Sequence, residues 1–486
     1  MKMRAFQAKP TMQLRILFIT LLISAIAFNS CRKISFIDDA SAMLSFSRDT
    51  VKFDTVFTSV GSATRSFKIY NKYNQNIRIS SLKLAGGSSS IFRMNVDGVS
   101  GIEFTDIEIP PDDSIYVFVE VTIDPNSNAL PYVVEDSIFF VTNNNQQQVQ
   151  LVAWGQNAIF YDGVVICDEV WDNTLPYVIY NSILVDTLCT LTINEGCRIY
   201  MHGSSSFYVL GTLKVLGTKD STVKFEGDRL ESFFNEIPGQ WEGISLLRSS
   251  KNNEIKYASI KNSNYGLLVG LQSTNPDLNS YLGDVTRPDL ILENTSIFDC
   301  ALSGVLAVNA EMEVTNCLIY NIGENNVALA SGGIYNFKHC TFANYGSAYL
   351  SHRSSILSIS DFISFGGPAV VNDLQQADFT NTIIYGNVLE GKEINISNDG
   401  GATVFNYNFN HSILRTELTD PNFVDCIINM DPKFASIGER NYYPDSLSIA
   451  VNAGIDIGVI EDITGAQRPF PGTLPDIGCY ETEYPE

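Results

Sequence analysis

A short phrase that recurs six times between Leu290 and Leu414 constrains the fold more than any other feature of this chain. Each copy is centred on an aliphatic or aromatic anchor. The anchors are Ile297, Ile319, Phe342, Ile363, Ile384 and Ile413. The first five are separated by 22, 23, 21 and 21 residues, and the last follows after 29. Repeats of roughly 20 to 25 residues are typical of solenoids, in which each unit packs against its neighbours.

The composition of the repeats favours strands over helices. They are rich in Ile, Val, Phe, Tyr, Thr and Asn, and runs such as Gly304–Val308 fit strands. Polar side chains at one turn position can form hydrogen bonds along a column of stacked units. Such a column is expected three residues before the anchors, at Asn294, Asn316, His339, Ser360, Asn381 and Asn410. We therefore predict a parallel β-helix with one coil per repeat and coils about 4.8 Å apart.

The first 30 residues have the form of an export signal. A basic start precedes an uncharged, mostly apolar run of 13 residues from Ile16 to Phe28, which is too short to span a bilayer. The run is followed by Asn29-Ser30-Cys31, and this junction resembles a bacterial lipoprotein signal. We expect Cys31 to be acylated, so that a lipid anchor holds the mature chain on a membrane, and residues 31–42 to form a tether. The alternative is plain secretion, with Cys31 an ordinary thiol.

The remaining chain divides by its pattern. Between residues 43 and 157, short alternating strands are separated by turn clusters, which predicts an immunoglobulin-like β-sandwich. The β-helix is expected over residues 158–414. The polar stretch from Leu271 to Asp289 is too long for a corner and is expected to project as a loop. The period fades after Arg415, so residues 415–486 are expected to form a C-terminal cap.

Several longer phrases carry a resemblance to a known group of proteins. They are DTVKFDTVFTSVGSATRSFKIYN, NVDG, VEDSIFFVTNNNQQQVQLVAWGQNA and WDNTLPYVIYNSILV, together with an ending in DIGCYE. These phrases resemble surface lipoproteins of Bacteroidetes, in which an immunoglobulin-like sandwich precedes a right-handed parallel β-helix with the pectate-lyase-like fold. The resemblance implies an all-β protein of the cell envelope, anchored at the outer membrane or cell surface. It points to no catalytic residue.

Charge and cysteine content exclude some classes of partner. The formal net charge is −23 and the pI is near 4.5, and no basic patch is available to neutralise phosphates, so nucleic acid is not expected to bind. The nine cysteines lack the spacing of a metal site. Cys317 and Cys340 share one column and are expected to be buried thiols. The stretch Asn395–Asp399 could bind Ca²⁺, but a solvated turn is the preferred interpretation, so no cofactor is expected, and the chain is expected to be a monomer.

A second polar column contains the candidate ligand-binding residues. It consists of Asn309, Ser331, His352, Asp373 and Ser397, flanked by Arg353 and Asn372, with Asp399 just beyond. In this register His352 and Arg353 lie one coil from Asp373, within about 5 to 7 Å. A cation beside a carboxylate can bind an acidic sugar or assist proton abstraction. The alternative is an ordinary polar corner. Tyr265 and Tyr281, near the projecting loop, could stack on sugar rings.

Three functions follow from these patterns. Non-catalytic binding of a glycan or another extracellular polymer is the leading hypothesis. The second is a polysaccharide lyase or glycoside hydrolase with a site around His352, Arg353 and Asp373. The paired aspartates and Gly-His-Gly of polygalacturonase-like hydrolases are absent from the candidate coil region, so the sequence favours binding over catalysis. The third is a structural or assembly protein of the cell envelope.

Overall fold

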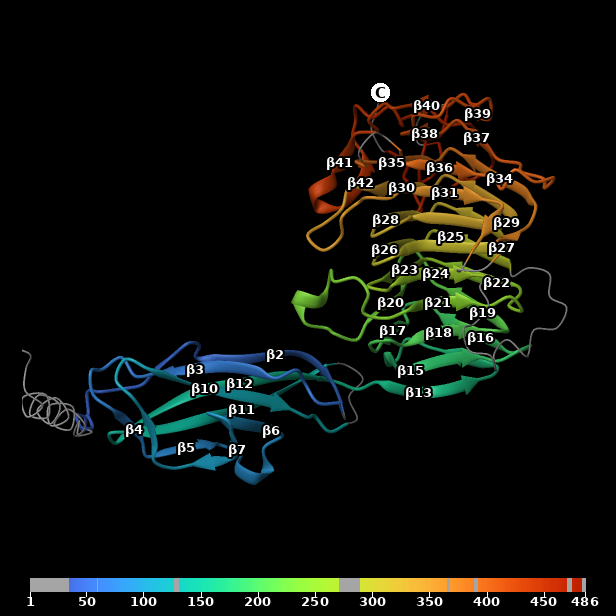
Figure 1. Ribbon diagram of the computed structural model, residues 1–486. Helices are drawn as coiled ribbons and strands as arrows, with labels where there is room; N and C mark the ends of the chain where they lie inside the picture. Colours follow the sequence, from blue (N-terminus) through green and yellow to red (C-terminus); the bar gives the residue numbers. More distant parts are fainter. Residues whose placement is uncertain are drawn as a thin grey trace, which may run out of the picture. The chain divides into compact units, whose positions relative to one another are not determined.

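The computed structural model describes residues 35–482, apart from residues 59, 126–130, 271–288, 365–367, 389–391 and 470–473. These residues divide into two compact units, which meet in sequence at residues 155 and 156. Strands and short 3₁₀ turns make up the regular structure of the described residues (Figure 1). Within these residues no helix is long and apolar enough to cross a membrane. Cys31 and Tyr281 lie outside the described residues.

The first unit is a sandwich of two five-stranded sheets. One sheet has the order β1 (Ser45–Phe46), β3 (Arg65–Tyr70), β10 (Ser114–Val121), β6 (Phe92–Val96), β7 (Val99–Gly101). The other has the order β2 (Thr50–Phe57), β12 (Asn145–Gln156), β11 (Tyr132–Thr142), β5 (Ser81–Leu84), β8 (Glu103–Phe104). A separate pair is β4 (Ile77–Ile79) with β9 (Ile107–Ile109). Buried and exposed residues alternate along β10, because one face of a half-buried strand packs on the core.

The stretch expected as a tether is part of this unit where the structure describes it. Phe36 forms a bridge to Asn76, and the side chain of Ala42 is 1% exposed. The side chain of Asn145 donates a hydrogen bond to the Ala40 carbonyl oxygen. Residues 35–42 therefore pack on the sandwich, because their apolar side chains and backbone groups find partners there.

The second unit is a solenoid of parallel coils, so the predicted all-β fold with a parallel β-helix is confirmed (Figure 1). Each coil contributes strands to three faces. Face A contains parts of β13 (Ile159–Ile166) and β15 (Tyr177–Val185), then β17 (Arg198–Met201), β20 (Val223–Gly227), β23 (Ala258–Lys261), β26 (Ser296–Cys300), β28 (Leu318–Ile322), β30 (Thr341–Asn344), β35 (Ile383–Gly386), β38 (Ile413–Leu414) and β40 (Ile427–Ile428).

The long strands bend from one face to the next. Face B contains the other parts of β13 and β15, then β18 (Ser206–Val209), β21 (Gly243–Leu246), β24 (Tyr265–Val269), parts of β27 (Ser303–Thr315) and β29 (Val327–Lys338), β31 (Leu357–Ser360) and β36 (Ile394–Ser397). Face C contains β14 (Glu169–Trp171), β16 (Thr190–Asn194), β19 (Thr212–Leu216), β22 (Asn253–Lys256), β25 (Asp289–Glu293), the rest of β27 and β29, β34 (Leu374–Thr380), β37 (Asn408–Asn410) and β39 (Phe423–Val424).

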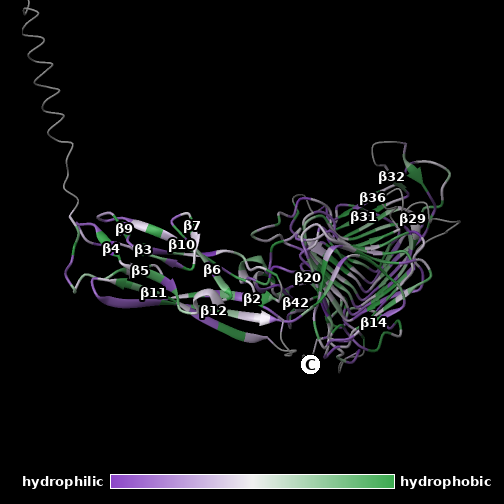
Figure 2. Ribbon diagram, turned by 90° about the horizontal axis from the view of Figure 1, so that it is seen from below, coloured by the Kyte–Doolittle hydropathy of each residue, from purple (hydrophilic) through white to green (hydrophobic). Residues whose placement is uncertain are grey.

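Apolar side chains fill the interior of the coils. On face A the inward column is Ile199, Phe225, Ile260, Ile297, Ile319, Phe342, Ile384 and Leu414, and each of these side chains is fully buried. On face C the rings of Phe337, Phe379 and Phe409 stack with centroids 4.7 Å apart. The hydrophobic segments of the coils are visible in Figure 2. The core is therefore one continuous apolar column, as stacked coils require.

Two of the predicted anchors are wrong. Phe342 pairs directly with Ile384, so one coil of 42 residues occupies the place of two predicted repeats. The predicted anchor Ile363 lies instead in a hairpin formed by β32 (Phe362–Ile363) and β33 (Val370–Val371). Leu414, not Ile413, continues the inward column. The loop between β30 and β31 and the hairpin together add about one repeat length to this coil, which explains why the period was preserved in the sequence.

A column of left-handed residues forms the corner between faces C and A. Its members have φ between 45° and 52° and are Tyr257, Asn294, Asn316, His339, Asn381, His411 and Asp425. Asn and Asp tolerate this conformation better than most residues. Asn316 donates a hydrogen bond to Asn294 at 3.1 Å, and Asn381 to His339 at 2.9 Å. Ser360 ends β31 on face B, and Asn410 precedes the corner residue His411.

The position after this corner explains several cysteines. It is occupied by Thr295, Cys317, Cys340, Thr382, Ser412 and Cys426. Each side chain donates its hydroxyl or thiol hydrogen to the carbonyl oxygen two residues earlier. The thiols therefore take the place of hydroxyl groups in a buried column.

The C-terminal segment differs from the predicted cap. The coil continues through β39 and β40, beyond residue 414, and β41 (Phe434–Ser436) then pairs with β42 (Asn441–Pro444). The rest of the segment lies along the corner column, where the Ile455 and Glu461 carbonyl oxygens accept hydrogen bonds from Asn381 and Asn316. It covers an apolar cluster on face A that includes Leu318 and Ile383. The segment is therefore a lateral cover, because the outer surface of face A is apolar here.

Candidate binding pocket at the end of face A

Three successive coils place an aromatic ring, a cation and an amide side by side on the outside of face A. Ile384 pairs with Leu414, and Leu414 pairs with Ile428. The next residues along the chain, which point outward, are Tyr385, Arg415 and Asn429. Because neighbouring parallel strands lie about 4.8 Å apart, these three side chains are direct neighbours in one column.

A pocket of about 540 Å³ is built around this column, and we call it the Arg415 pocket. Its lining residues are Tyr345, Tyr385, Gly386, Asn387, Arg415, Glu417, Asn429, Asp431 and Ile437. The volume lies in the range of pockets that hold small ligands. The tyrosines and Arg415 are half-buried walls, whereas Glu417 and Asp431 are exposed at the mouth. At Gly386 a side chain is excluded, because a Cβ would lie 2.4 Å from the Asn344 carbonyl oxygen.

Arg415 is held from inside the coil. Its Nη1 donates a hydrogen bond to the Gly386 carbonyl oxygen and lies 3.9 Å from Oε1 of Glu393. Its guanidinium lies over the ring of Tyr385, 5.7 Å from the centroid. These contacts fix the guanidinium against the wall of the Arg415 pocket and leave its other nitrogens for a ligand.

A buried histidine stands behind this arginine. Oε2 of Glu393 lies 2.8 Å from Nε2 of His352, and Oε1 accepts a hydrogen bond from the Val388 backbone at 2.9 Å. The side chains of His352 and Glu393 are 1% and 0% exposed. A buried carboxylate is stable only with such partners. His352, Glu393 and Arg415 therefore form a chain of contacts from the interior to the Arg415 pocket.

The two phenols of the pocket are hydrogen-bond donors at neutral pH. Burial raises the pKa of Tyr345 and of Tyr385, and the nearby charge of Asp431 raises both further, which outweighs the opposite effect of Arg415. Among the described residues the buried hydroxyl of Tyr345 has no hydrogen-bond partner. The pocket thus offers phenol and guanidinium donors beside carboxylate acceptors.

The predicted second polar column is wrong beyond Ser331. The pairing of Leu329 with Ile359 brings Asp361, not His352, next to Ser331 along face B. His352 lies on the loop between β30 and β31, and Asp373 directly precedes β34 on face C. The structure shows no hydrogen bond or ion pair between Asp373 and His352 or Arg353, all of which it describes. The loop between β30 and β31 is the reason, because it lengthens the step from Leu329 to Ile359 to 30 residues and so displaces the sequence spacing from the coil spacing.

The other predicted site residues have separate surroundings. Asn372 donates to the Ser331 hydroxyl at 2.8 Å, and Oδ1 of Asp373 accepts from the Val404 backbone at 2.9 Å. Arg353 and Asp399 are exposed, and the Asp399 backbone donates to Asp361. Tyr265 is half-buried at the start of β24 on face B. Its role in stacking on sugars stays a prediction, as does that of Tyr281.

Sequence reasoning missed Tyr385, Arg415 and Glu393. The residue after each anchor points outward on face A, so the corrected anchors Ile384 and Leu414 lead directly to Tyr385 and Arg415. The off-by-one anchor Ile413 concealed this alignment. Glu393 follows residues 389–391, which the structure does not describe, and no repeat signal marks it.

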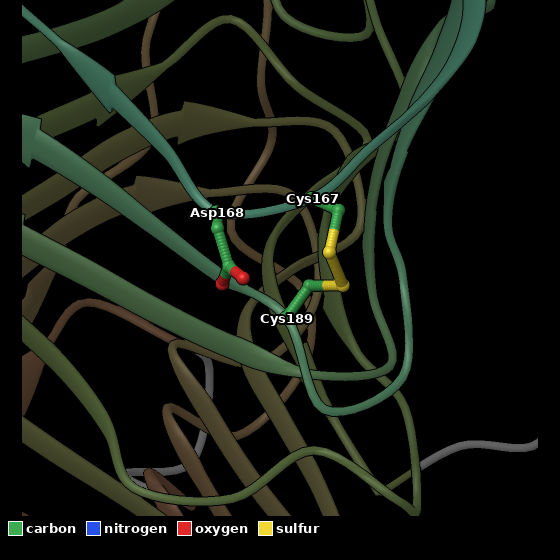
Figure 3. Close-up of side chains that lie close together, drawn as sticks. All are labelled: Cys167, Asp168 and Cys189. Carbon is green, nitrogen blue, oxygen red and sulfur yellow. A yellow bond between two sulfur atoms is a disulfide. The ribbon is translucent and has the colours of Figure 1, made fainter.

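Two other features could be taken for a site, but each offers a ligand fewer polar groups than the Arg415 pocket does. Cys167, Asp168 and Cys189 lie within 4.8 Å of one another, but the two sulfur atoms form a disulfide, so they offer no thiolate to a metal (Figure 3). On the first unit, a hollow of about 700 Å³ is lined by residues of β6, β7 and β10, including Arg93 and Phe118. Nη1 of Arg93 already donates to two backbone carbonyl oxygens, so the hollow offers fewer free polar groups.

By its fold, this protein belongs to the class of all-β proteins: its first unit is a sandwich and its second unit is a parallel β-helix. No family model matches the chain, and no curated protein matches it. Among solved structures, it is similar to the A-module of the mannuronan C-5 epimerase AlgE6 from Azotobacter vinelandii, with 11% identity over 57% of this chain and 83% of that chain and a TM-score of 0.33.

Two other solved structures are similar over different extents. The catalytic unit of the GH87 α-1,3-glucanase from Streptomyces thermodiastaticus is 12% identical, over 72% of this chain and 73% of that chain, with a TM-score of 0.25. A family 123 glycoside hydrolase from Clostridium perfringens is 9% identical with a TM-score of 0.17, and the match spans only 26% of that chain. All three are carbohydrate-active enzymes. At these identities and scores, the likeness says nothing about what this chain binds.

Proposed function

We propose that this protein is an exported lipoprotein of the cell envelope whose β-helix binds a glycan without chemical conversion. In this proposal Cys31 carries the lipid, the sandwich is of the immunoglobulin-like type, and the β-helix is right-handed. The glycan is bound in the Arg415 pocket. The sequence supports the anchor through its export signal and the Ser30-Cys31 junction.

The composition of the Arg415 pocket carries the proposal. A sugar has apolar faces and a rim of hydroxyl groups, so its recognition needs aromatic surface together with donors and acceptors. Tyr345 and Tyr385 supply aromatic surface and phenol donors, Arg415 supplies a further donor, and the carboxylates of Glu417 and Asp431 supply acceptors. Both phenols are held protonated, which suits binding and not proton abstraction.

A glycan array followed by calorimetry tests the proposal. The complete mature chain is applied to the array, and the affinity of retained glycans is measured for wild type and for Tyr385→Ala. Loss of the ring is expected to weaken binding by about tenfold, or about 1.4 kcal/mol. Phe118→Ala, in the hollow of the first unit, is the matched control and is expected to bind as wild type does.

Two results would contradict the proposal. Retention of no glycan would favour a structural role in the envelope. Binding that is lost in Phe118→Ala and kept in Tyr385→Ala would move the site to the sandwich. A thermal unfolding curve for each variant shows whether the fold is intact, since Tyr385 is half-buried.

A further inference from the structure

The positive charge in the Arg415 pocket is already compensated. The guanidinium of Arg415 lies 3.9 Å from Glu393, whose side chain is fully buried and therefore unscreened by water. Its Nη1 also donates to the Gly386 carbonyl oxygen. Arg415 therefore contributes directed donors to a ligand, and Glu393 offsets part of its positive charge.

The negative charges at the mouth are not compensated. Glu417 and Asp431 are exposed, and neither forms an ion pair with any side chain that the structure describes. Oδ1 of Asp431 accepts a hydrogen bond from the Lys433 backbone, which leaves its other oxygen free. Asp431 lines the pocket together with both tyrosines, and its charge raises the pKa of both phenols. The mouth is thus acidic, and two aromatic rings lie behind it.

This combination selects a cation. An ammonium group is attracted by the two exposed carboxylates and by the ring of Tyr345, since Arg415 already lies over Tyr385, whereas a uronate carboxylate would be repelled by Glu417 and Asp431. We infer that the Arg415 pocket binds a glycan that carries free amino groups, in preference to a neutral or an acidic glycan. This inference rests on the proposed function and adds the chemical class of the ligand.

Three oligosaccharides of equal length and different charge class test the inference. They are a glucosamine hexamer with free amines, the N-acetylated hexamer and a galacturonate hexamer, each titrated into the complete mature chain by calorimetry at low salt. The amine-bearing hexamer is expected to bind at least about tenfold more tightly than the N-acetylated one, and this difference should shrink as salt is raised. Equal or tighter binding of the N-acetylated or galacturonate hexamer would overturn the inference.

Charge-removing variants locate the preference. Glu417→Gln and Asp431→Asn are each expected to weaken binding of the amine-bearing hexamer about three- to tenfold more than they weaken binding of the N-acetylated hexamer, because the amide keeps an acceptor oxygen and loses only the charge. Glu311→Gln, which removes an exposed carboxylate on face C, is the matched control and should change neither affinity. An unchanged preference in both mouth variants would overturn the inference.

The same titrations separate the two proposals. If none of the three hexamers binds, and the array retains no other glycan, the proposed function fails. If the neutral or the acidic hexamer binds and the amine-bearing one binds more weakly, the proposed function stands and the inference about charge fails.

Discussion

His339 lies between Asn316 and Asn381 in the corner column, where three of the seven residues are Asn. Its side chain is 1% exposed, and its Nε2 accepts a hydrogen bond from Asn381. Burial lowers the pKa of His339 well below its usual 6.5, and the nearby positive charge of Arg468 lowers it further. The folded protein therefore keeps this imidazole neutral at pH values where the unfolded chain would protonate it.

The replacement His339→Asn is expected to reduce the acid sensitivity of folding. Below about pH 6.5 the unfolded state binds one proton more than the folded state at this residue, so stability falls by up to about 1.4 kcal/mol per pH unit as the pH decreases. Asn fits the left-handed backbone and can accept from Asn381. Urea unfolding of both proteins between pH 7 and pH 5 measures the two slopes, and parallel curves would contradict the prediction.

At the scale of elements, the strand type and the stacking could be predicted from the sequence, because anchors such as Ile297, Ile319 and Phe342 recur at coil spacing. The register of the coils after Phe342 could not be predicted from the sequence. The loop between β30 and β31 and the hairpin β32–β33 together add about one repeat length, so Ile363 falls at the anchor spacing although it lies outside the stack. A periodic pattern reports the distance between similar residues and does not show whether the chain between them closes a coil.

The prediction of the candidate site was wrong because it rested on the same incorrect register. A shift of one residue in a strand exchanges its inward and outward faces, so placing the last anchor at Ile413 hid the outward position of Arg415. The spacing predicts that His352 lies beside Asp373, which is wrong. His352 instead contacts Glu393, and Glu393 lies 3.9 Å from Arg415 of the pocket. Such a contact depends on loop conformation, which sequence spacing alone does not determine.

The C-terminal cover is fastened to the coil by a buried arginine. Arg468 is fully buried at its side chain, pairs with Glu481 at 3.0 Å and donates to the Gly478 carbonyl oxygen and to Asn316. These contacts join separate parts of the cover to one another and to the corner column. We therefore expect the position of the cover to depend on the side chain of Arg468.

Replacing this residue, Arg468→Met, is expected to cost about 3 to 5 kcal/mol, because the buried carboxylate of Glu481 would lose its ion-pair partner. Hydrogen exchange should show selective loss of protection in residues 450–482. The control Arg229→Met removes a partly exposed pair with Glu231 and should cost less than about 1 kcal/mol. A uniform loss of protection along all coils in Arg468→Met would contradict a local fastening role.

At the scale of the whole molecule, the proposed anchor makes Cys31 unlike every other cysteine. We expect Cys31→Ser to move the protein from the membrane fraction to the soluble fraction and to abolish incorporation of a labelled fatty acid. Cys426→Ser is the control, because Ser412 occupies the preceding place in the same column and shows that a hydroxyl fits there. Continued labelling of Cys31→Ser would show that the lipid is attached elsewhere or that the signal is a simple secretory one.

The last strands of the coil also affect how molecules behave toward one another. In a parallel stack, the final layer presents its backbone to whatever comes next, and a second polypeptide could extend it. Here β39 and β40 contain two residues each. An incoming chain would gain only a handful of backbone hydrogen bonds from them, too few to offset the entropy lost on association. The brevity of these strands therefore disfavours polymerisation into fibres, even at the crowded surface where we propose that the protein resides.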